Sequence, residues 1–186
     1  MARVLVVYAS DYGNTKKAAE VVAEGAKSVE DTDVVVKAAE DVGEADMTSA
    51  DAVIVGTPVH MGSPDWRIKK FIDTVCSALW LKDAMKGKVA AVFATGGGFG
   101  SAGGGVELTL LGLLNNFAEL GMFIVPLPKS TPGYSKGGLQ WGPYGRSANE
   151  NGEPAGVPDD SLEAAKHHGK HVARAAALLR EAKVFE

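Results

Sequence analysis

Short apolar runs, rich in β-branched residues, recur along the chain and alternate with longer amphipathic stretches. Uninterrupted apolar runs of this length are typical of strands that are buried on both faces of a parallel sheet. The pattern predicts five such strands, at residues 3–9, 33–37, 52–56, 88–94 and 123–125.

The stretches between the strands repeat apolar residues at helical spacing. They predict helices at residues 14–28, 65–76, 106–120 and 161–183, the last capped by Asp159 or Asp160. Strands that alternate with helices form βαβ units and a parallel sheet. We therefore expect a doubly wound α/β fold, with five parallel strands in the order 2-1-3-4-5 and helices on both faces.

Residues 126–158 break this pattern, because they are rich in Gly, Pro, Ser and Asn and show no periodicity. An irregular stretch of this length inside a domain is usually functional or disordered. Trp141 and Tyr144 argue against pure disorder here. A chain of 186 residues fits one domain. We expect that domain to cover residues 1–186, with a long insertion at about residues 127–158.

Composition narrows the class of protein. The formal net charge of −4 argues against a nucleic-acid partner, which would require a basic stripe. Cys76 is the single cysteine and is expected to be a buried, inert thiol. No apolar run approaches the ~18 residues of a membrane span, and the chain opens directly on a strand without a leader. We expect a cytoplasmic protein.

The segment after the first predicted strand has the features of a phosphate loop. It consists of Ser10, Asp11, Tyr12, Gly13, Asn14 and Thr15. Gly13 permits a sharp turn, and the following helix N-terminus offers free N–H groups. Neither the G-x-x-x-x-G-K-[ST] nor the G-x-G-x-x-G pattern is present, so neutral donors for a monophosphate such as that of FMN are favoured. The Asp11 side chain should point away from that phosphate. An ordinary capped βα turn is the alternative.

Two further loops should lie beside this one in the predicted sheet. The first follows the third strand and includes Pro58, Val59, His60, Met61 and Gly62. The second follows the fourth strand, where seven of the ten positions from 96 to 105 are glycine, and it includes Thr95, Gly96, Gly97 and Gly98. Glycine lets the backbone approach a flat ring closely. Three adjacent loops of this kind are more specific than any one alone.

The three loops resemble those of flavodoxin-like FMN proteins, and most closely those of the WrbA-type NAD(P)H:quinone oxidoreductases. Gly13 after the first strand resembles the family's S-x-Y-G loop, and Gly56-Thr57-Pro58 with Gly62 resembles its G-T-P-T-R-F-G loop. Further similar segments are Leu79-Trp80, Gly121-Met122 through Pro126, and Gly142-Pro143-Tyr144-Gly145. The resemblance covers nearly the whole chain and implies a flavodoxin-like fold.

The resemblance also implies roles for the loops. Ser10 to Thr15 would hold the FMN phosphate, Pro58 to Gly62 would meet the isoalloxazine ring, and Thr95 to Gly98 would line its other polar edge. Tyr12 would touch NAD(P)H, and Trp80 would wall the substrate pocket, often that of a neighbouring subunit. Enzymes of this family are typically tetramers that reduce quinones by two-electron ping-pong exchange. A homo-oligomer, tetramer or dimer, is therefore expected, with His60, Tyr12 and Trp80 as catalytic residues.

Three positions depart from the family pattern. Val59-His60 replaces the family's Thr-Arg, Met61 replaces an aromatic residue, and Leu120 replaces a histidine. His60 could partly replace the missing arginine. FMN binding should survive these changes, because the backbone makes many of its contacts. The rate of quinone reduction depends more directly on the side chains that have changed. A one-electron carrier and an FMN-binding oligomer with little turnover remain alternatives.

A histidine group near the C-terminus is the one candidate for a metal site. His167, His168 and His171 lie on the last predicted helix, without an H-E-x-x-H pattern. We expect a solvated helix face there and no metal.

Overall fold

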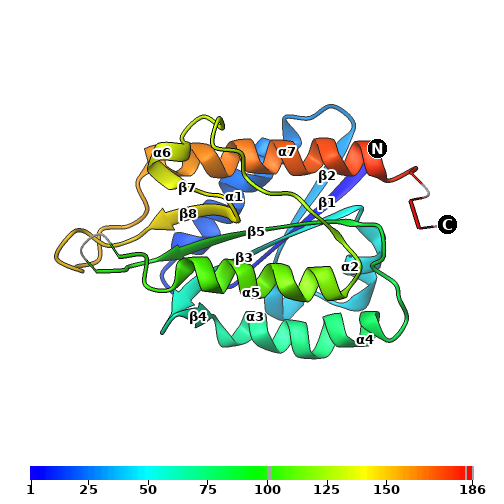
Figure 1. The fold of residues 1–186 in the computed structure, drawn as a ribbon, viewed down its shortest axis with the longest axis horizontal. Helices are drawn as coiled ribbons and strands as arrows, with labels where there is room; N and C mark the ends of the chain where they lie inside the picture. The colour runs from blue at the N-terminus through cyan, green and yellow to red at the C-terminus, as the bar shows by residue number, and fades with distance from the viewer. Residues whose placement is uncertain (100–101, 183, 186) are drawn as a thin grey trace.

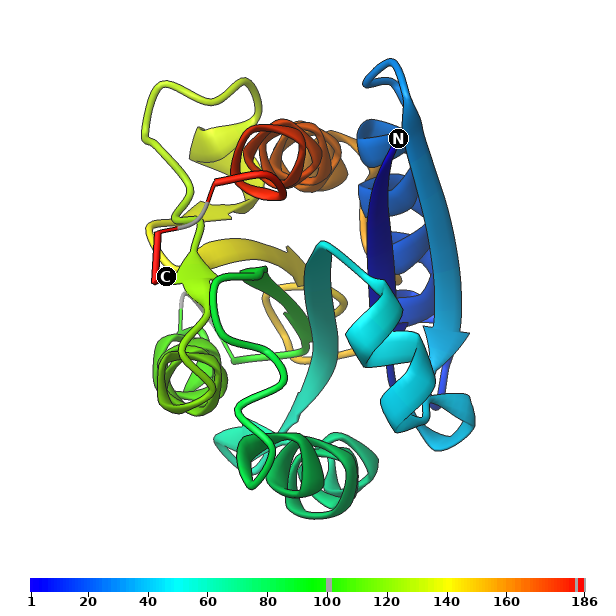
Figure 2. The ribbon, with the colours of Figure 1, turned by 90° about the vertical axis from the view of Figure 1, so that its right-hand side faces the viewer.

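A central sheet with helices on both faces organises the computed structural model, which describes residues 1–99, 102–182 and 184–185 (Figures 1 and 2). Its strands are β1 (Ala2–Tyr8), β2 (Thr32–Ala38), β3 (Ala52–His60), β4 (Ser63–Pro64), β5 (Val89–Gly96), β6 (Phe123–Ile124), β7 (Gly138–Leu139) and β8 (Gly142–Arg146). Its α-helices are α1 (Asn14–Lys27), α2 (Glu44–Ser49), α3 (Trp66–Phe71), α4 (Ser77–Trp80), α5 (Val106–Glu119), α6 (Tyr134–Gly137) and α7 (Glu163–Leu179). No helix in these ranges has both the length and the apolar composition that crossing a bilayer requires.

The parallel strands follow the predicted order. The sheet runs β2-β1-β3-β5-β8-β7, and the pairs β2-β1, β1-β3, β3-β5 and β5-β8 are parallel. The first four positions are the predicted strands 2, 1, 3 and 4. The doubly wound α/β prediction is therefore confirmed.

The fifth position of the sheet differs from the prediction, because two short strands share it. β6 lies beside Val89 and Ala90 at the start of β5, and β8 lies beside its last residues, Ala94 to Gly96. The sequence predicted only the first of these strands. β8 is Gly-Pro-Tyr-Gly-Arg, which has no apolar run. The segment expected to be irregular thus contains α6, β7 and β8, and β8 completes the sheet.

The segment after the third strand is also more regular than the predicted loop at residues 57–64. β3 continues to His60, turns at Met61 and Gly62, and returns as β4. Val59 pairs with Pro64 and His60 with Ser63 in an antiparallel hairpin. Both turn residues have positive φ, 49° at Met61 and 74° at Gly62. In Figure 1 this hairpin projects beyond the carboxyl end of the sheet.

Each face of the sheet has its own hydrophobic core, because successive strand residues point to opposite faces. Val4 and Val6 of β1 pack with α1 and α7, whereas Leu5 and Val7 pack on the face covered by α2, α3, α4 and α5. Figure 2 shows these two helix layers above and below the strands. The continuous apolar runs thus fill both cores.

The last helix differs from the sequence prediction in two respects. Asp159 and Asp160 do not cap it but form a 3-10 turn, Asp159–Leu162, ahead of α7. His168, a residue of α7 that was expected on a solvated face, is fully buried. The prediction of a solvated face was therefore wrong for His168. Its neighbour Gly169 lies where α1 and α7 approach closely, since a Cβ on Gly169 would lie 2.0 Å from the Val22 carbonyl oxygen.

Candidate functional site

Three segments meet at the carboxyl edge of the parallel sheet, where open α/β folds bind their ligands. They follow β1, β3 and β5, as the sequence predicted. The hydroxyl oxygens of Thr15, on α1, and Thr95, at the end of β5, lie 2.7 Å apart in a buried hydrogen bond. This bond joins the first segment to the third across 80 residues of sequence.

The first segment forms a concave turn into α1. Gly13 has a φ of 83°, which L side chains rarely adopt, and precedes the first residue of the helix. The Ser10 Oγ is buried and has no hydrogen-bond partner among the described residues. Buried hydroxyl groups nearly always have a partner, so this one is available to a ligand. Asn14 Oδ1 accepts a hydrogen bond from the Val157 N–H, and Tyr12 is 91% exposed.

The second segment is the β3–β4 hairpin, which carries Pro58, Val59, His60, Met61 and Gly62. Met61 is fully exposed at its tip. Gly105, at the start of α5, packs against Gly62 so closely that a Cβ on Gly105 would lie 2.7 Å from the Gly62 Cα. The hairpin therefore rests on the glycine-rich segment.

The third segment begins with Thr95 and Gly96, the last residues of β5, and continues with Gly97 and Gly98. The Gly96 carbonyl oxygen accepts hydrogen bonds from the Tyr144 hydroxyl at 2.8 Å and from the Ser147 N–H at 2.9 Å. Residues 100 and 101, also within this glycine-rich segment, lie outside the described residues. The residues after Tyr144 thus brace the start of this segment.

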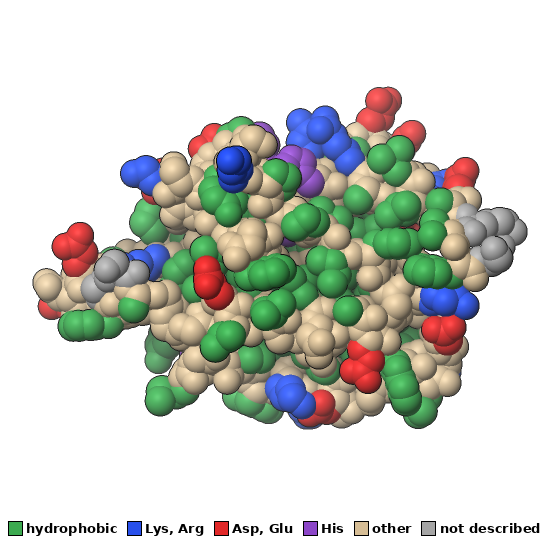
Figure 3. All heavy atoms as spheres, viewed as in Figure 1, with side chains coloured by type: hydrophobic (Ala, Val, Ile, Leu, Met, Phe, Trp, Pro, Cys, Tyr) green, Lys and Arg blue, Asp and Glu red, His purple; other side chains and the backbone are tan. Residues whose placement is uncertain are grey.

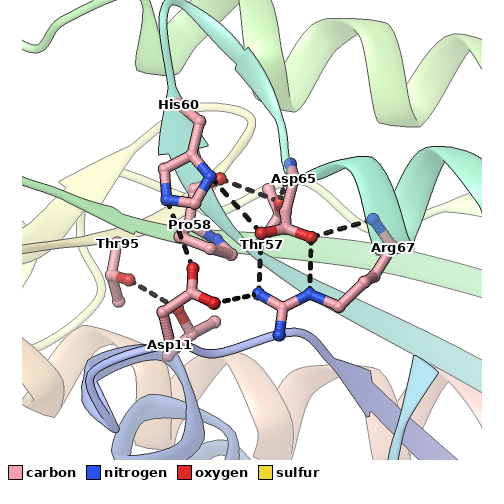
Figure 4. A network of polar contacts seen from close by, with 8 residues as sticks. Asp11, Thr57, Pro58, His60, Asp65, Arg67 and Thr95 are labelled. Carbon is pink, nitrogen blue, oxygen red and sulfur yellow. Dashed lines mark hydrogen bonds and ion pairs between the residues drawn. The ribbon is translucent and has the colours of Figure 1, made fainter. Parts of the chain in front are cut away.

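A charged network joins the first two segments (Figure 4). The Arg67 guanidinium donates through Nη2 to Asp11 at 2.7 Å and to Asp65 at 2.8 Å, and through Nε to Asp65 at 2.8 Å. His60 Nδ1 lies 3.3 Å from Asp65, and its Nε2 lies 3.6 Å from Asp11. Asp11 thus turns toward Arg67 and His60.

Asp65 is the buried anchor of this network. Its carboxylate caps α3 by accepting the Arg67 N–H, and its own N–H donates to the Thr57 hydroxyl. Burial would raise the pKa of Asp65, but the hydrogen bonds from Arg67 and the charges of Arg67 and His60 outweigh it and lower the pKa below its usual range. The same Asp65 hydrogen bonds raise the pKa of Arg67, so the pair stays ionised.

Sequence reasoning missed Asp65 and Arg67. The signal that could have found them is the D-x-R spacing at the predicted start of a helix, where an aspartate caps and an arginine two residues later folds back on it. The meeting of Arg67 with Asp11, 56 residues away, has no sequence signal.

Asp11, His60 and Asp65 also form a group with metal-ligand chemistry, since one ligand atom from each lies within 4.8 Å of the others. The group already contains a cation, because Arg67 donates to both carboxylates. This arrangement is an ion-pair network in which one guanidinium charge is shared between two carboxylates.

Trp80 and Leu120 lie away from the three segments. Each ends a helix that leads back to the start of the next strand, so both lie near the amino edge of the sheet (Figure 1). Together with Cys76, Ser77 and Asn116 they line a cavity of about 180 Å³. Within one chain, Trp80 is therefore not brought to the other predicted site residues.

Comparisons with known proteins agree with this geometry. The family model described as "Flavodoxin domain" matches residues 5–99. A protein named flavodoxin from Aquifex aeolicus is 41% identical over 120 residues, 64% of each chain. A protein named NAD(P)H dehydrogenase (quinone) from Paraburkholderia phymatum is 35% identical, covering 96% of this chain and 99% of its own. The crystal structure of a WrbA-like flavodoxin from Agrobacterium tumefaciens superposes with a TM-score of 0.71 at 28% identity, over 96% of this chain and 99% of that one. The chain belongs to the flavodoxin family.

Proposed function

We propose that this protein binds FMN at the carboxyl edge of its sheet and acts as an NAD(P)H:quinone oxidoreductase. The observation that carries the proposal is the convergence of three segments at the carboxyl edge of the sheet, one of which carries a buried hydroxyl without a partner among the described residues, just ahead of a helix N-terminus. Relatives named NAD(P)H dehydrogenase (quinone) that align along nearly the whole chain support the activity. When bound, FMN would supply the two-electron chemistry, with a hydride passing from NAD(P)H to a quinone.

The residues of the first segment fit a phosphate. The Ser10 hydroxyl would donate one hydrogen bond, and the N–H groups at the start of α1 would donate others. The left-handed conformation of Gly13 would turn these groups inward. Asn14 and Thr15 would add polar side chains, although Thr15 is already bonded to Thr95. Neutral donors of this kind suit a monophosphate.

The other two segments would hold the ring. Pro58, Val59 and His60 would lie along it from the hairpin, and Gly96 to Gly98 would offer backbone groups to its polar edge. Val59 and Gly96 already lie close together: a Cβ on Gly96 would be 3.2 Å from the Val59 Cβ. Met61 and Gly62 would close the hairpin side.

The exposed side chains at this edge would meet the substrates. Tyr12 is accessible for contact with the nicotinamide nucleotide. His60, with 45% of its side chain exposed, is the ionisable group of the hairpin and would hydrogen-bond the ring edge or exchange a proton with solvent. One shared opening would require NAD(P)⁺ to leave before the quinone enters, which is ping-pong exchange.

Trp80 would act between subunits. We propose a homo-oligomer, dimer or tetramer, in which Trp80 of one subunit walls the substrate pocket of another. Its 53% exposure leaves the indole free for such a contact. Leu108, Leu111, Ile124 and Trp141 line an apolar hollow on the face seen in Figure 3, where hydrophobic side chains gather over α5. Exposed apolar patches of this kind often mark subunit contacts. We also propose that residues 1–186 form one domain, because β8 joins the same sheet as β1.

Anaerobic reduction of the FMN-loaded protein tests the function. NADH or NADPH should bleach the visible flavin absorption, and a benzoquinone added afterwards should restore it with formation of one hydroquinone per flavin. His60→Ala should slow one of these half-reactions, whereas His167→Ala, a histidine of α7 outside the site, should slow neither. Retained flavin that neither nucleotide bleaches would refute the reductase activity.

A flavodoxin-type one-electron carrier is the second candidate. The Aquifex relative that is named flavodoxin favours it. Tyr12, 91% exposed, and Phe99, 71% exposed, are aromatic side chains next to the site that could stack on the ring of such a carrier. Reduction by single electrons from a partner protein, without any reduction by NAD(P)H, would support the carrier.

A further inference from the structure

The aspartate of the phosphate loop poses an electrostatic problem that the fold has to solve. Asp11 lies directly after Ser10 and two residues before Gly13, within the loop whose neutral donors face a phosphate. A phosphate monoester carries close to two negative charges at neutral pH, so a nearby free carboxylate would repel it. A phosphate loop with this residue needs a compensating cation.

Arg67 is placed to provide that compensation. Its guanidinium donates to Asp11 at 2.7 Å, with 13% of the Arg67 side chain and 40% of the Asp11 side chain exposed, so solvent screens this pair in part. Two hydrogen bonds to Asp65 fix the guanidinium plane, and Asp65 is 1% exposed and anchored by its own N–H on Thr57. His60 approaches Asp11 from the other side, at 3.6 Å.

We propose that Arg67, held by Asp65, is a positioning and specificity residue for the cofactor: it draws the Asp11 carboxylate out of the phosphate loop and offsets part of its charge, so that the loop accepts a phosphorylated flavin. The proposal rests on FMN as the ligand of the site. It assigns to Arg67 an effect on the phosphate end of the cofactor and none on the ring itself. The pair also ties the phosphate loop to the start of α3, next to the β3–β4 hairpin.

The comparison of FMN with riboflavin separates charge compensation from a merely structural role, because riboflavin lacks the phosphate. In Arg67→Gln, Asp11 loses its cation, and we expect the dissociation constant for FMN to rise by about tenfold, the size of a partly screened charge pair. The dissociation constant for riboflavin should change by less than about threefold on the same scale. Adding Asp11→Asn to Arg67→Gln removes the repelling charge and should restore FMN affinity to within about threefold of the wild type.

Two further variants complete the test. Lys69→Gln removes the same charge from the same helix, where Lys69 pairs with the exposed Asp73, and should leave both affinities unchanged. Asp11→Asn alone should shift FMN affinity by less than about threefold, because the carboxylate is already turned toward Arg67 and His60. This single variant keeps the proposal testable if Arg67→Gln does not fold.

Four results would overturn the proposal. They are an equal loss of FMN and riboflavin affinity in Arg67→Gln, an unchanged FMN affinity in that variant, no rescue by Asp11→Asn, and a large gain or loss of FMN affinity in Asp11→Asn alone. Failure of the unmodified protein to bind either flavin would instead refute the FMN site itself. Isothermal titration of the apoprotein with each flavin provides these affinities.

Discussion

The hydroxyl groups of Thr15 and Thr95 form a buried hydrogen bond of 2.7 Å that connects the phosphate loop to the end of β5. Each residue is 1% exposed. Neither hydroxyl can turn to water if the other is removed, so the two groups act as one structural unit that sets the spacing of two loops.

Replacement of one partner should therefore cost more than replacement of both. We expect Thr15→Val to lower the free energy of unfolding of the apoprotein by about 1–3 kcal/mol, because the Thr95 hydroxyl loses its partner. The double variant Thr15→Val with Thr95→Val should lose clearly less than the sum of the two single variants. Urea unfolding of all three proteins, with Thr74→Val on an exposed helix face as control, measures this. Simple additivity would contradict the pairing.

Alanine substitutions at Gly13 and Gly112 form a matched pair that tests whether the backbone conformation of Gly13 matters. A Cβ at either position meets no atom within 4 Å, but Gly13 has a φ of 83° and Gly112 lies inside α5. Gly13→Ala should destabilise the protein by about 1–2 kcal/mol through backbone strain alone and should weaken FMN binding. Gly112→Ala should stabilise it by about 0.5–1 kcal/mol. Thermal unfolding reports both signs, and equal effects at the two positions would show that the Gly13 conformation is unimportant.

His168 should make the protein sensitive to acid. Burial first, and the charge of His171 second, lower the pKa of His168 to about 3, whereas in the unfolded chain it should be about 6.5. Between these values the unfolded state binds a proton that the folded state does not. The contribution of neutral His168 to stability is therefore complete above about pH 6.5 and is lost as the pH falls toward 3.

Substitution should remove this part of the pH dependence. His168→Leu is expected to reduce the slope of unfolding free energy against pH by up to about 1.4 kcal/mol per pH unit between pH 6 and 4. Asn115→Gln, on the exposed face of α5, should keep the wild-type slope. Denaturant unfolding at several pH values gives the comparison, and an unchanged slope in His168→Leu would mean that this imidazole is not the titrating group.

Cys76 should be unreactive while the protein is folded. The thiol is 3% exposed, and burial raises its pKa to about 12, so almost no thiolate exists at pH 8. An aromatic disulfide reagent should modify it only as fast as the protein opens. Cys76→Ala with Ser77→Cys moves the thiol to an exposed neighbour and should react within the mixing period. Prompt reaction of the unmodified protein would contradict the burial of Cys76.

Local pattern was sufficient for the parallel sheet but not for the parts that depend on tertiary contacts. The runs around Val4 and Val53 predict their strands because burial on both faces leaves few polar residues. β8 escaped prediction because Gly142 to Arg146 relies on β5 for its pairing and carries no apolar run of its own.

The candidate site likewise contains features that local sequence predicts and features that depend on tertiary contacts. Gly13, after a buried strand, predicts from local sequence alone the loop that is proposed here to bind phosphate, and Thr57-Pro58 predicts the next loop. Arg67 was missed because its significance comes from contact with Asp11, which lies 56 residues away in the sequence. His168 was placed on a solvated face because its neighbours in the sequence are polar, whereas in the fold it is fully buried.

Flavin retention by the purified protein tests the central claim most directly. The apoprotein would be mixed with FMN, desalted and examined by visible spectroscopy, beside a Ser10→Ala variant and a Ser28→Ala control at the end of α1. The account predicts that the unmodified protein and the control keep one FMN per chain, and that Ser10→Ala binds it about tenfold more weakly, since one hydrogen bond to a charged phosphate is lost. Complete loss of flavin from the unmodified protein on desalting would contradict the account and would leave the three loops as ordinary turns of the fold.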